Sequence, residues 1–369
     1  MKKALLAFAL ALISVFTLVA CSGGNYEIAM ITDSGGIDDK SFNQGTWEGI
    51  VEYATENGKT YKYYKPREVS DTAYLRAIKL AVRGGAKIVI TPGYLFETAI
   101  YEAQTLYPEV KFVLIDGEPH TADYATYKTE ANTMNILFDE HEVGFYAGYA
   151  AVYGGLTNLG FFGGMAVPAV QRFGIGYIAG AYYAADDLGV TITFPAEHYE
   201  YLGSFAPTPE AKTKAATWYS GGVQVIFAAA GGAGSSAMAA AVEATGSKYV
   251  IGVDKDQSGD STSVITSALK GVGEAAISAL EDFYGNTWEG GRTISLGSVE
   301  GGVALPADFS RFGANAAEVK AAYEAIFAEV VAGNIVVPTN DRASLGAFLT
   351  NLGVSNQALV DKAEPAPAA

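Results

Sequence analysis

Polar residues and glycines directly follow the apolar runs that we expect to form strands. Six such positions recur along the chain: Asp33, Thr91, Asp116, Gly163, Gly231 and Asp254. The carboxyl ends of parallel strands meet at one edge of a sheet, so these residues should converge there. A carboxylate at that edge can accept hydrogen bonds from two vicinal hydroxyls and so bind a neutral sugar ring without a counter-ion.

An aspartate after a strand can instead cap the following helix, because its side chain accepts hydrogen bonds from the first-turn amides. Capping is the better explanation for Asp71 and stays open for Asp116. It suits Asp254 less well, since the polar run 255–257 follows it.

The richest junction of this kind lies in the run SGGIDDKSFNQGTWEGI (34–50), after the apolar strand pattern 28–32. Its polar and aromatic side chains are Asp33, Asp38, Asp39, Lys40, Phe42 and Asn43. Ser41 and Gln44 have the spacing of a capping box, which predicts that a helix begins here. The pattern indicates a ligand-binding edge, and a solvated polar loop is the alternative.

Motifs for catalysis and for metal binding are incomplete. The run SALK (267–270) matches the S-x-x-K pattern of serine β-lactamases, but neither S-D-N nor K-T-G follows it. The loop GGAG (231–234) lacks the lysine of a phosphate-binding loop. Three widely spaced histidines, His120, His141 and His198, do not form a zinc pattern. We therefore expect no enzyme activity, no metal and no cofactor.

Strand and helix patterns alternate along most of the chain. After the first unit, strands are predicted at 61–65, 87–91, 110–116, 159–162, 190–194, 223–228 and 249–254. Helices are predicted from Asp71 and at 95–106, 140–153, 170–188 and 235–244. This alternation predicts two α/β lobes with doubly wound parallel sheets.

The first 20 residues have the form of an export signal. Lys2 and Lys3 precede an unbroken apolar run that ends at Ala20. The run LVAC (18–21) resembles the lipobox of bacterial lipoproteins, so we expect residues 1–20 to be removed and Cys21 to carry a lipid anchor on a short linker, 21–25. A buried structural cysteine is the alternative. Cys21 is the only cysteine, so an intrachain disulfide is excluded.

Composition describes an acidic chain that is too long for one core. Without the signal, 22 basic and 40 acidic side chains remain among 349 residues, a formal charge of −18. We therefore expect no nucleic acid as a partner, because phosphate binding needs clustered Lys and Arg. The length favours two lobes, and no second apolar stretch reaches the length of a bilayer span.

Several spaced motifs together resemble the basic membrane protein family of lipoproteins, whose best-known members are purine nucleoside receptors. In chain order they are GGIDDKSFNQGTWEG, GGM with VPAVQRFGIGYIAG, YLGSF, VIFAAAGGAG, IGVDKDQ and TSALK. The resemblance implies a type I periplasmic-binding-protein fold, with two lobes joined by three crossovers around a ligand cleft. It also implies an extracytoplasmic monomer on the cell membrane that delivers nucleosides to the permease and ATPase subunits of an ABC importer.

The family pattern assigns roles to residues of this chain. Phe42 would stack on the base opposite Phe205, while groups near Asp33 and Asn43 would bind its edge. Asp116, Asp254 and Lys270 would bind the ribose, and Gly231 and Gly232 would let the backbone approach the sugar. Lys40, in the motif DKSFN, is included among the ligand-binding residues. Because Ala206 and Pro207 follow Phe205 where relatives often have Asn or Asp, Phe173 or Phe227 could instead be the second aromatic.

The resemblance also implies lobe boundaries. Lobe 1 is expected at 26–135 and 256–287, lobe 2 at 136–255 and 288–360, and a disordered tail at 361–369. Other readings stay open: the same fold with a sugar, a signalling molecule or a free base as ligand, a surface interaction protein, or an enzyme such as a nucleoside hydrolase.

Overall fold

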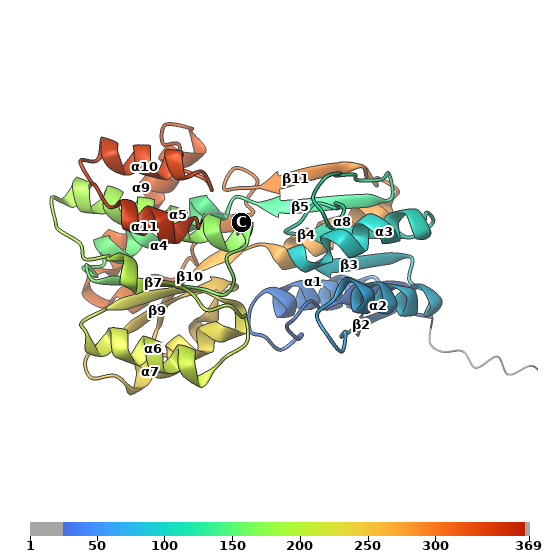
Figure 1. Ribbon diagram of the computed structural model, residues 1–369, viewed down its shortest axis with the longest axis horizontal. Helices are drawn as coiled ribbons and strands as arrows, with labels where there is room; N and C mark the ends of the chain where they lie inside the picture. Colours follow the sequence, from blue (N-terminus) through green and yellow to red (C-terminus); the bar gives the residue numbers. More distant parts are fainter. Residues whose placement is uncertain (1–24, 366–369) are drawn as a thin grey trace, which may run out of the picture.

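The computed structural model describes residues 25–365. These residues form two α/β lobes that lie side by side (Figure 1). The signal (1–20), Cys21 and most of the linker lie outside the described residues. Within residues 25–365, no helix has the length and apolar character needed to cross a membrane.

Lobe 1 is built on a six-stranded parallel sheet of order β11-β5-β4-β3-β1-β2. Its strands are β1 (Ile28–Ile31), β2 (Tyr61–Tyr64), β3 (Ile88–Pro92), β4 (Lys111–Ile115), β5 (Thr133–Phe138) and β11 (Arg292–Leu296). Its helices are α1 (Phe42–Glu56), α2 (Asp71–Arg83), α3 (Glu97–Leu106) and α8 (Val272–Gly285). Along β1, alternate residues enter different apolar clusters, with Met30 on one face and Ile31 on the other, so both faces of the sheet are covered.

Lobe 2 repeats this plan, with strand order β12-β10-β9-β8-β6-β7. Its strands are β6 (Leu159–Gly163), β7 (Tyr199–Tyr201), β8 (Val225–Ala229), β9 (Tyr249–Asp254), β10 (Val264–Lys270) and β12 (Val303–Ala304), of which β12 is antiparallel. Its helices are α4 (Glu140–Tyr153), α5 (Pro168–Leu188), α6 (Pro209–Ser220), α7 (Gly234–Glu243), α9 (Ala316–Val331), α10 (Arg342–Asn351) and α11 (Gln357–Ala363). The predicted fold class is confirmed.

Three crossovers join the lobes, at 139, 271 and 297–302. The predicted lobe boundaries are wrong in three places. The boundary after 135 cuts β5, which belongs to lobe 1 as far as Phe138. The segment assigned to lobe 1 from 256 includes β10, which pairs with β9 of lobe 2, and the segment assigned to lobe 2 from 288 includes β11, which pairs with β5 of lobe 1. Which sheet a strand joins depends on tertiary pairing, and local periodicity carries no such information.

Local differences from the sequence prediction occur near α5 and at the end of the chain. The predicted strand 190–194 is reduced to one bridge between Thr193 and Asn158, and β7 forms at Tyr199–Tyr201 instead, because the Tyr199 ring is buried against β6. The predicted tail 361–369 begins too early, since 361–363 complete α11 and Ala363 is fully buried.

Glycines let the helices α4 and α5 pack with their backbones in contact. A Cβ on Gly176 would stand 1.9 Å from the His141 carbonyl oxygen, and one on Gly148 would stand 2.3 Å from the Tyr177 carbonyl oxygen. Lobe 1 has a similar contact between α1 and α8, where a Cβ on Gly49 would stand 2.4 Å from the Gly273 carbonyl oxygen. Only glycine fits at these backbone contacts.

Candidate ligand-binding site

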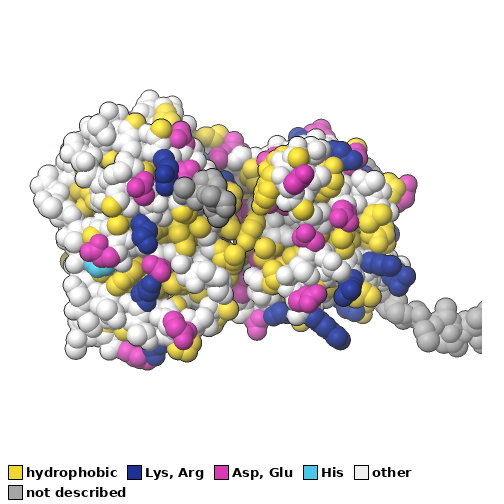
Figure 2. Space-filling view, in the orientation of Figure 1, with side chains coloured by type: hydrophobic (Ala, Val, Ile, Leu, Met, Phe, Trp, Pro, Cys, Tyr) yellow, Lys and Arg dark blue, Asp and Glu magenta, His cyan; other side chains and the backbone are white. Residues whose placement is uncertain are grey.

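The cleft between the lobes brings together most of the residues that the sequence indicated. It holds about 710 Å³ of space between protein atoms, counting its open mouth, which is the size of a small-molecule site. Nine of the ten predicted residues line it: Asp33, Phe42, Asn43, Asp116, Phe205, Gly231, Gly232, Asp254 and Lys270. Figure 2 shows the furrow between the lobes, flanked by hydrophobic side chains.

Two aspartates occupy equivalent positions in the two lobes. Asp116 directly follows β4 and Asp254 ends β9, and each of these strands is third from the same end of its sheet. Both have left-handed backbones, with φ of 62° and 67°. That conformation is uncommon outside glycine and marks positions held by the surrounding structure. It places one carboxylate from each lobe on the cleft.

Lys270 lies between the lobes and is almost completely buried. Its ammonium group pairs with the Asp116 carboxylate and, at 3.0 Å, with Oε1 of Glu140. Arg172 pairs with the other oxygen of Glu140. The Lys270 Nζ also stands 4.7 Å from the centre of the Phe42 ring, within range of a cation–π contact. Two cations and two carboxylates therefore form one network at the hinge.

Burial and these neighbours shift the ionisation of the network. Burial disfavours a charged Lys270, but the carboxylates around it, Asp116 first, outweigh burial and raise its pKa. For Asp116 burial prevails over the attraction of Lys270 and raises the pKa to about 6. For Glu140 the attraction of Arg172 and Lys270 outweighs burial and lowers the pKa. Glu140 is therefore the carboxylate whose negative charge Arg172 and Lys270 stabilise, and Asp116 is the carboxylate that can still accept a hydrogen bond from a ligand.

Asp116 and Asp254 differ in the hydrogen bonds that their carboxylates already accept. Among residues 25–365, Oδ1 of Asp116 has no hydrogen-bond partner, although it is buried. Asp254 accepts a hydrogen bond at Oδ2 from the Ser41 hydroxyl, and burial raises the Asp254 pKa. Each aspartate keeps one oxygen for a further donor.

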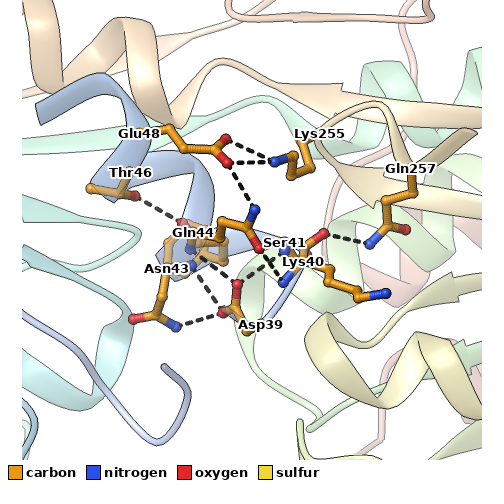
Figure 3. Close-up of polar contacts among 10 residues, drawn as sticks. Asp39, Lys40, Ser41, Asn43, Gln44, Thr46, Glu48, Lys255 and Gln257 are labelled. Carbon is orange, nitrogen blue, oxygen red and sulfur yellow. Dashed lines mark hydrogen bonds and ion pairs between the residues drawn. The ribbon is translucent and has the colours of Figure 1, made fainter. Parts of the chain in front are cut away.

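The start of α1 departs from the predicted capping box. The Ser41 hydroxyl makes no cap; Asp39 accepts from the backbone amides of Ser41, Asn43 and Gln44 instead (Figure 3). The prediction was wrong because the Ser41 hydroxyl is used by Asp254, a partner 213 residues away that local spacing cannot reveal.

Asp33 and Asn43 form a fixed polar wall of the cleft. The Asn43 amide donates to Asp33 Oδ1 and to Asp39 Oδ2, both at 2.9 Å, so its donors are already used. Asp33 Oδ1 also accepts from the Gly35 amide at 2.8 Å. Burial raises the pKa of Asp33 to about 6 despite these hydrogen bonds. The available group at this wall is Oδ2 of Asp33.

Four aromatic rings line the cleft: Phe42, Tyr94, Phe173 and Phe205. The Phe205 ring lies over Gly164, where a Cβ would stand 2.2 Å from a ring carbon. Phe227, one of the alternatives for the second aromatic, is fully buried and packs edge-on against Phe173 at 5.8 Å. Phe227 therefore belongs to the core of lobe 2, and Phe173 and Phe205 remain on the cleft.

Gly231 follows β8 with a φ of 55°, and a Cβ there would be 3.5 Å from the Phe205 ring. Gly232 lies beside it, close to the Phe205 and Asp39 carbonyl oxygens. This backbone therefore reaches the cleft without side chains of its own.

Lys40 is the one predicted residue that does not line this cleft. Its side chain is half exposed and pairs with Asp260 at 3.3 Å. Sequence reasoning also missed Glu140, which pairs with Lys270, and Arg172, which pairs with the other oxygen of Glu140. The run VPAVQRFG contained Arg172, but nothing local indicated that it meets the first residue of α4. Within residues 25–365, no three acidic, histidine or cysteine side chains are grouped to hold a metal ion.

The fold and cleft are those of a solute-binding protein, and the chain belongs to the family described as ABC transporter substrate-binding protein PnrA-like, which matches residues 26–341. A relative is the ABC transporter nucleoside-binding protein BmpA of Lactococcus lactis, 31% identical over 92% of this chain and 100% of that protein. Basic membrane protein A of Borreliella burgdorferi is 31% identical over 92% of this chain and 96% of its own length. The resemblance found in the sequence is confirmed.

Solved structures agree on the fold. A solute-binding protein of an ABC transporter system from Aeropyrum pernix has a TM-score of 0.72 at 23% identity, over 91% of this chain and 99% of that chain. The arabinose-binding protein AraP of Geobacillus stearothermophilus has a TM-score of 0.56 at 12% identity, over 77% and 97%. At these identities the likeness concerns the fold alone.

Proposed function

We propose that this protein is a lipid-anchored, extracytoplasmic receptor that captures nucleosides, preferably purine nucleosides, by lobe closure and delivers them to an ABC importer. The observation that carries the proposal is the pair Asp116 and Asp254. One carboxylate from each lobe faces the cleft, and each keeps an oxygen for a donor.

The two aspartates suit a ribose. Vicinal hydroxyls can donate to the free oxygens of Asp116 and Asp254, and hydrogen bonds to ionised acceptors contribute about 1.5–3 kcal/mol. Lys270 offsets the repulsion between the carboxylates. Among residues 25–365, Lys270 is the one cation that lines the cleft, and it is already paired with two carboxylates, so this part of the chain offers a phosphate group no unpaired cation there. An uncharged sugar fits this arrangement better than a nucleotide does.

The aromatic rings and Asp33 suit a base. A ring between Phe42 and Phe205 would gain roughly 1–3 kcal/mol per stacked base. Because the Asn43 donors are already used, Asp33 Oδ2 is the group left to bind the base edge. As an acceptor it favours bases that present an N–H donor. Purines and pyrimidines both can do so, and the preference for purines therefore rests on the resemblance to the basic membrane protein family.

Capture would require both lobes. Asp33, Phe42 and Asp116 come from lobe 1, and Phe205, Asp254 and Lys270 come from lobe 2. A ligand that contacts all of them stabilises only the closed arrangement. The permease and ATPase subunits of the importer would then receive the closed form. The anchor at Cys21 would hold the protein on the outer face of the cell membrane.

A thermal-unfolding screen of residues 22–369 tests this proposal. Purine and pyrimidine nucleosides, free bases, ribose and nucleotides are compared, and a ligand at about a hundred times its dissociation constant adds roughly 2.7 kcal/mol. We expect shifts with purine nucleosides that exceed those with ribose or bases. A shift with ribose alone would identify a sugar receptor, and no shift with any of them would exclude the proposed ligand class.

A further inference from the structure

Two consecutive residues of lobe 1, Lys40 and Ser41, form hydrogen bonds with two nearby residues of lobe 2, Gln257 and Asp254, beside the cleft. Ser41, the residue before α1, donates its hydroxyl hydrogen to Asp254, the last residue of β9. The preceding residue, Lys40, accepts at its carbonyl oxygen a 2.8 Å hydrogen bond from Nε2 of Gln257. The Gln257 Oε1 in turn accepts from the amide of Val253 at 3.0 Å. Figure 3 shows the Gln257 amide pointing at Lys40.

Gln257 is held rigidly within lobe 2. Its side chain is 2% exposed, and its backbone amide donates to the Ser267 hydroxyl at 3.1 Å. The Oε1 of its side-chain amide is bound within lobe 2, and the Nε2 donates to lobe 1. A buried Nε2 without an acceptor would be costly, so this contact favours the arrangement in which the lobes are together.

Lys40 is shaped to receive this hydrogen bond. Its φ of 60° is left-handed, which is uncommon for a residue with a Cβ, and it directs the carbonyl oxygen towards lobe 2. The Lys40 side chain points away to Asp260. The backbone carbonyl of Lys40, rather than its ammonium group, therefore accepts the hydrogen bond from Gln257 beside the cleft.

The remaining contacts on this side are more exposed. Lys255 pairs with Glu48 at 2.7 Å and Lys40 pairs with Asp260 at 3.3 Å, and in each pair one side chain is about half exposed. Exposed ion pairs contribute little. The buried hydrogen bond of Ser41 and the partly buried hydrogen bond of Gln257 are accordingly the main direct bonds between lobes on this side.

We propose that Gln257 is a positioning residue for ligand capture, which holds lobe 1 against lobe 2 through the Lys40 carbonyl while it fixes the strand end that presents Asp254. The inference rests on the proposed function, because capture by closure gives this contact its effect on affinity. Gln257 lies outside the ligand cleft, so it acts through closure and not through ligand contact.

The test is Gln257→Glu, which separates the two ends of the side chain. A carboxylate keeps the acceptor for the Val253 amide but places an oxygen opposite the Lys40 carbonyl, so only the bond between lobes is lost. We expect inosine or adenosine to bind at least about 10-fold more weakly, mainly through faster dissociation, because one partly buried hydrogen bond is replaced by repulsion. In small-angle scattering the ligand-free variant should have a larger radius of gyration than the parent.

Two further variants complete the experiment. Gln257→Met removes both hydrogen bonds, and Lys212→Ala removes an exposed ion pair within lobe 2 and should leave affinity unchanged. The proposal is overturned if Gln257→Glu binds as tightly as the parent while Gln257→Met does not, because Gln257 would then serve lobe 2 alone. If the parent binds no nucleoside, the proposed function fails by itself, and equal radii of the ligand-free parent and Gln257→Glu would overturn this inference separately.

Discussion

The two lobes share one strand plan but contribute different chemistry to the cleft. At equivalent strand ends they match: Asp116 and Asp254 both have a left-handed backbone, and Gly93 and Gly231 both have positive φ at the start of a short 3-10 helix. After their first strands they differ. The loop after β1 and the first turn of α1 supply Asp33, Asp39 and Asn43, whereas the loop after β6 and the first turn of α5 supply Val167 and Pro168.

This difference divides the site. The matched strand ends provide a symmetric pair of carboxylates, and the unmatched loops give the cleft one polar and one apolar wall. Lys270 stands where the lobes meet, bound by Asp116 of lobe 1 and by Glu140 at the start of α4. The strand plan that the lobes share thus supplies the pair of carboxylates. The segments that differ between the lobes supply the polar wall and the apolar wall of the cleft.

Removal of the cation shared by the lobes should have the largest effect. In Lys270→Met, the buried Asp116 and Glu140 lose their common partner, and breaking a buried pair costs about 3–5 kcal/mol. Urea unfolding measures the loss. The control is Lys212→Met, which removes an exposed ion pair and should lower the free energy of unfolding by under about 1 kcal/mol. Lys248→Met would not be a suitable control, because Lys248 donates to the Val223 carbonyl oxygen. Equal losses in Lys270→Met and Lys212→Met would contradict the network.

Substitution of the matched aspartates tests whether the lobes contribute equally to binding. Asn tolerates the left-handed backbone, so Asp116→Asn and Asp254→Asn remove charge without changing the turn. Each should weaken nucleoside binding about 10- to 100-fold, the loss of a hydrogen bond to an ionised acceptor. Isothermal calorimetry measures both, with the exposed Asp186→Asn as control. A loss in only one variant would show that the symmetric pair is not used as a pair.

Helix packing provides a comparison away from the ligand. Gly176→Ala in lobe 2 and Gly49→Ala in lobe 1 each push a Cβ into a backbone carbonyl, and overpacking of this kind costs about 1–3 kcal/mol. The closer contact, at Gly176, should cost more. Gly346→Ala in α10 meets no atom within 4 Å and should be neutral or stabilising. Thermal unfolding ranks the three variants, and a Gly176→Ala protein as stable as the parent would refute the backbone contact.

The polar wall of lobe 1 should make the protein sensitive to pH. The pKa of Asp33 is 3.8 when unperturbed and about 6 in the folded protein, so the folded state holds the proton more tightly. Stability of the ligand-free protein should therefore fall as the pH rises from about 4 to 6. The full shift corresponds to about 3 kcal/mol, and we expect under about 1.5 kcal/mol because the carboxyl group meets water in the cleft.

Asp33→Asn should remove this component of the pH dependence and raise ligand-free stability at pH 7. Nucleoside affinity of the parent should fall as the pH drops from 7 to 5, because protonated Asp33 is a poorer acceptor. Calorimetric titrations at several pH values measure both effects, with Asp38→Asn on the exposed part of the same loop as control. An Asp33→Asn protein with the parent's pH profile would rule out Asp33 as the source.

Much of the frame could be predicted from sequence because the signals are local. Period-2 and period-3.6 patterns located β1, β3, β4, β9 and the helices between them, and the rule that parallel strands end at one edge brought nine of the ten site residues to one cleft. The strand predicted at 190–194 does not form. The segment that pairs with β6 is Tyr199–Tyr201, where the Tyr199 ring is fully buried.

Pairings between distant segments could not be predicted. Asp39 caps α1 because the Ser41 hydroxyl donates to Asp254. Lys270 pairs with Asp116 and Glu140, which lie 154 and 130 positions away. Lys40 was placed with the ligand by its motif, yet both its carbonyl and its ammonium group bind residues of lobe 2, Gln257 and Asp260, outside the ligand cleft. Spacing along the chain does not encode such contacts.

The sequence by itself determined the alternation of strands and helices, the acids and glycines at strand ends, and the family. These follow from side-chain periodicity and from backbone preferences, which act within a few residues. Only the tertiary structure decided which sheet β10 and β11 join, which carboxylates share Lys270, and which oxygens stay free for a ligand. Burial and hydrogen-bond partners are set when segments more than 100 residues apart pack together, because desolvation makes each buried polar group find a partner in space rather than in sequence.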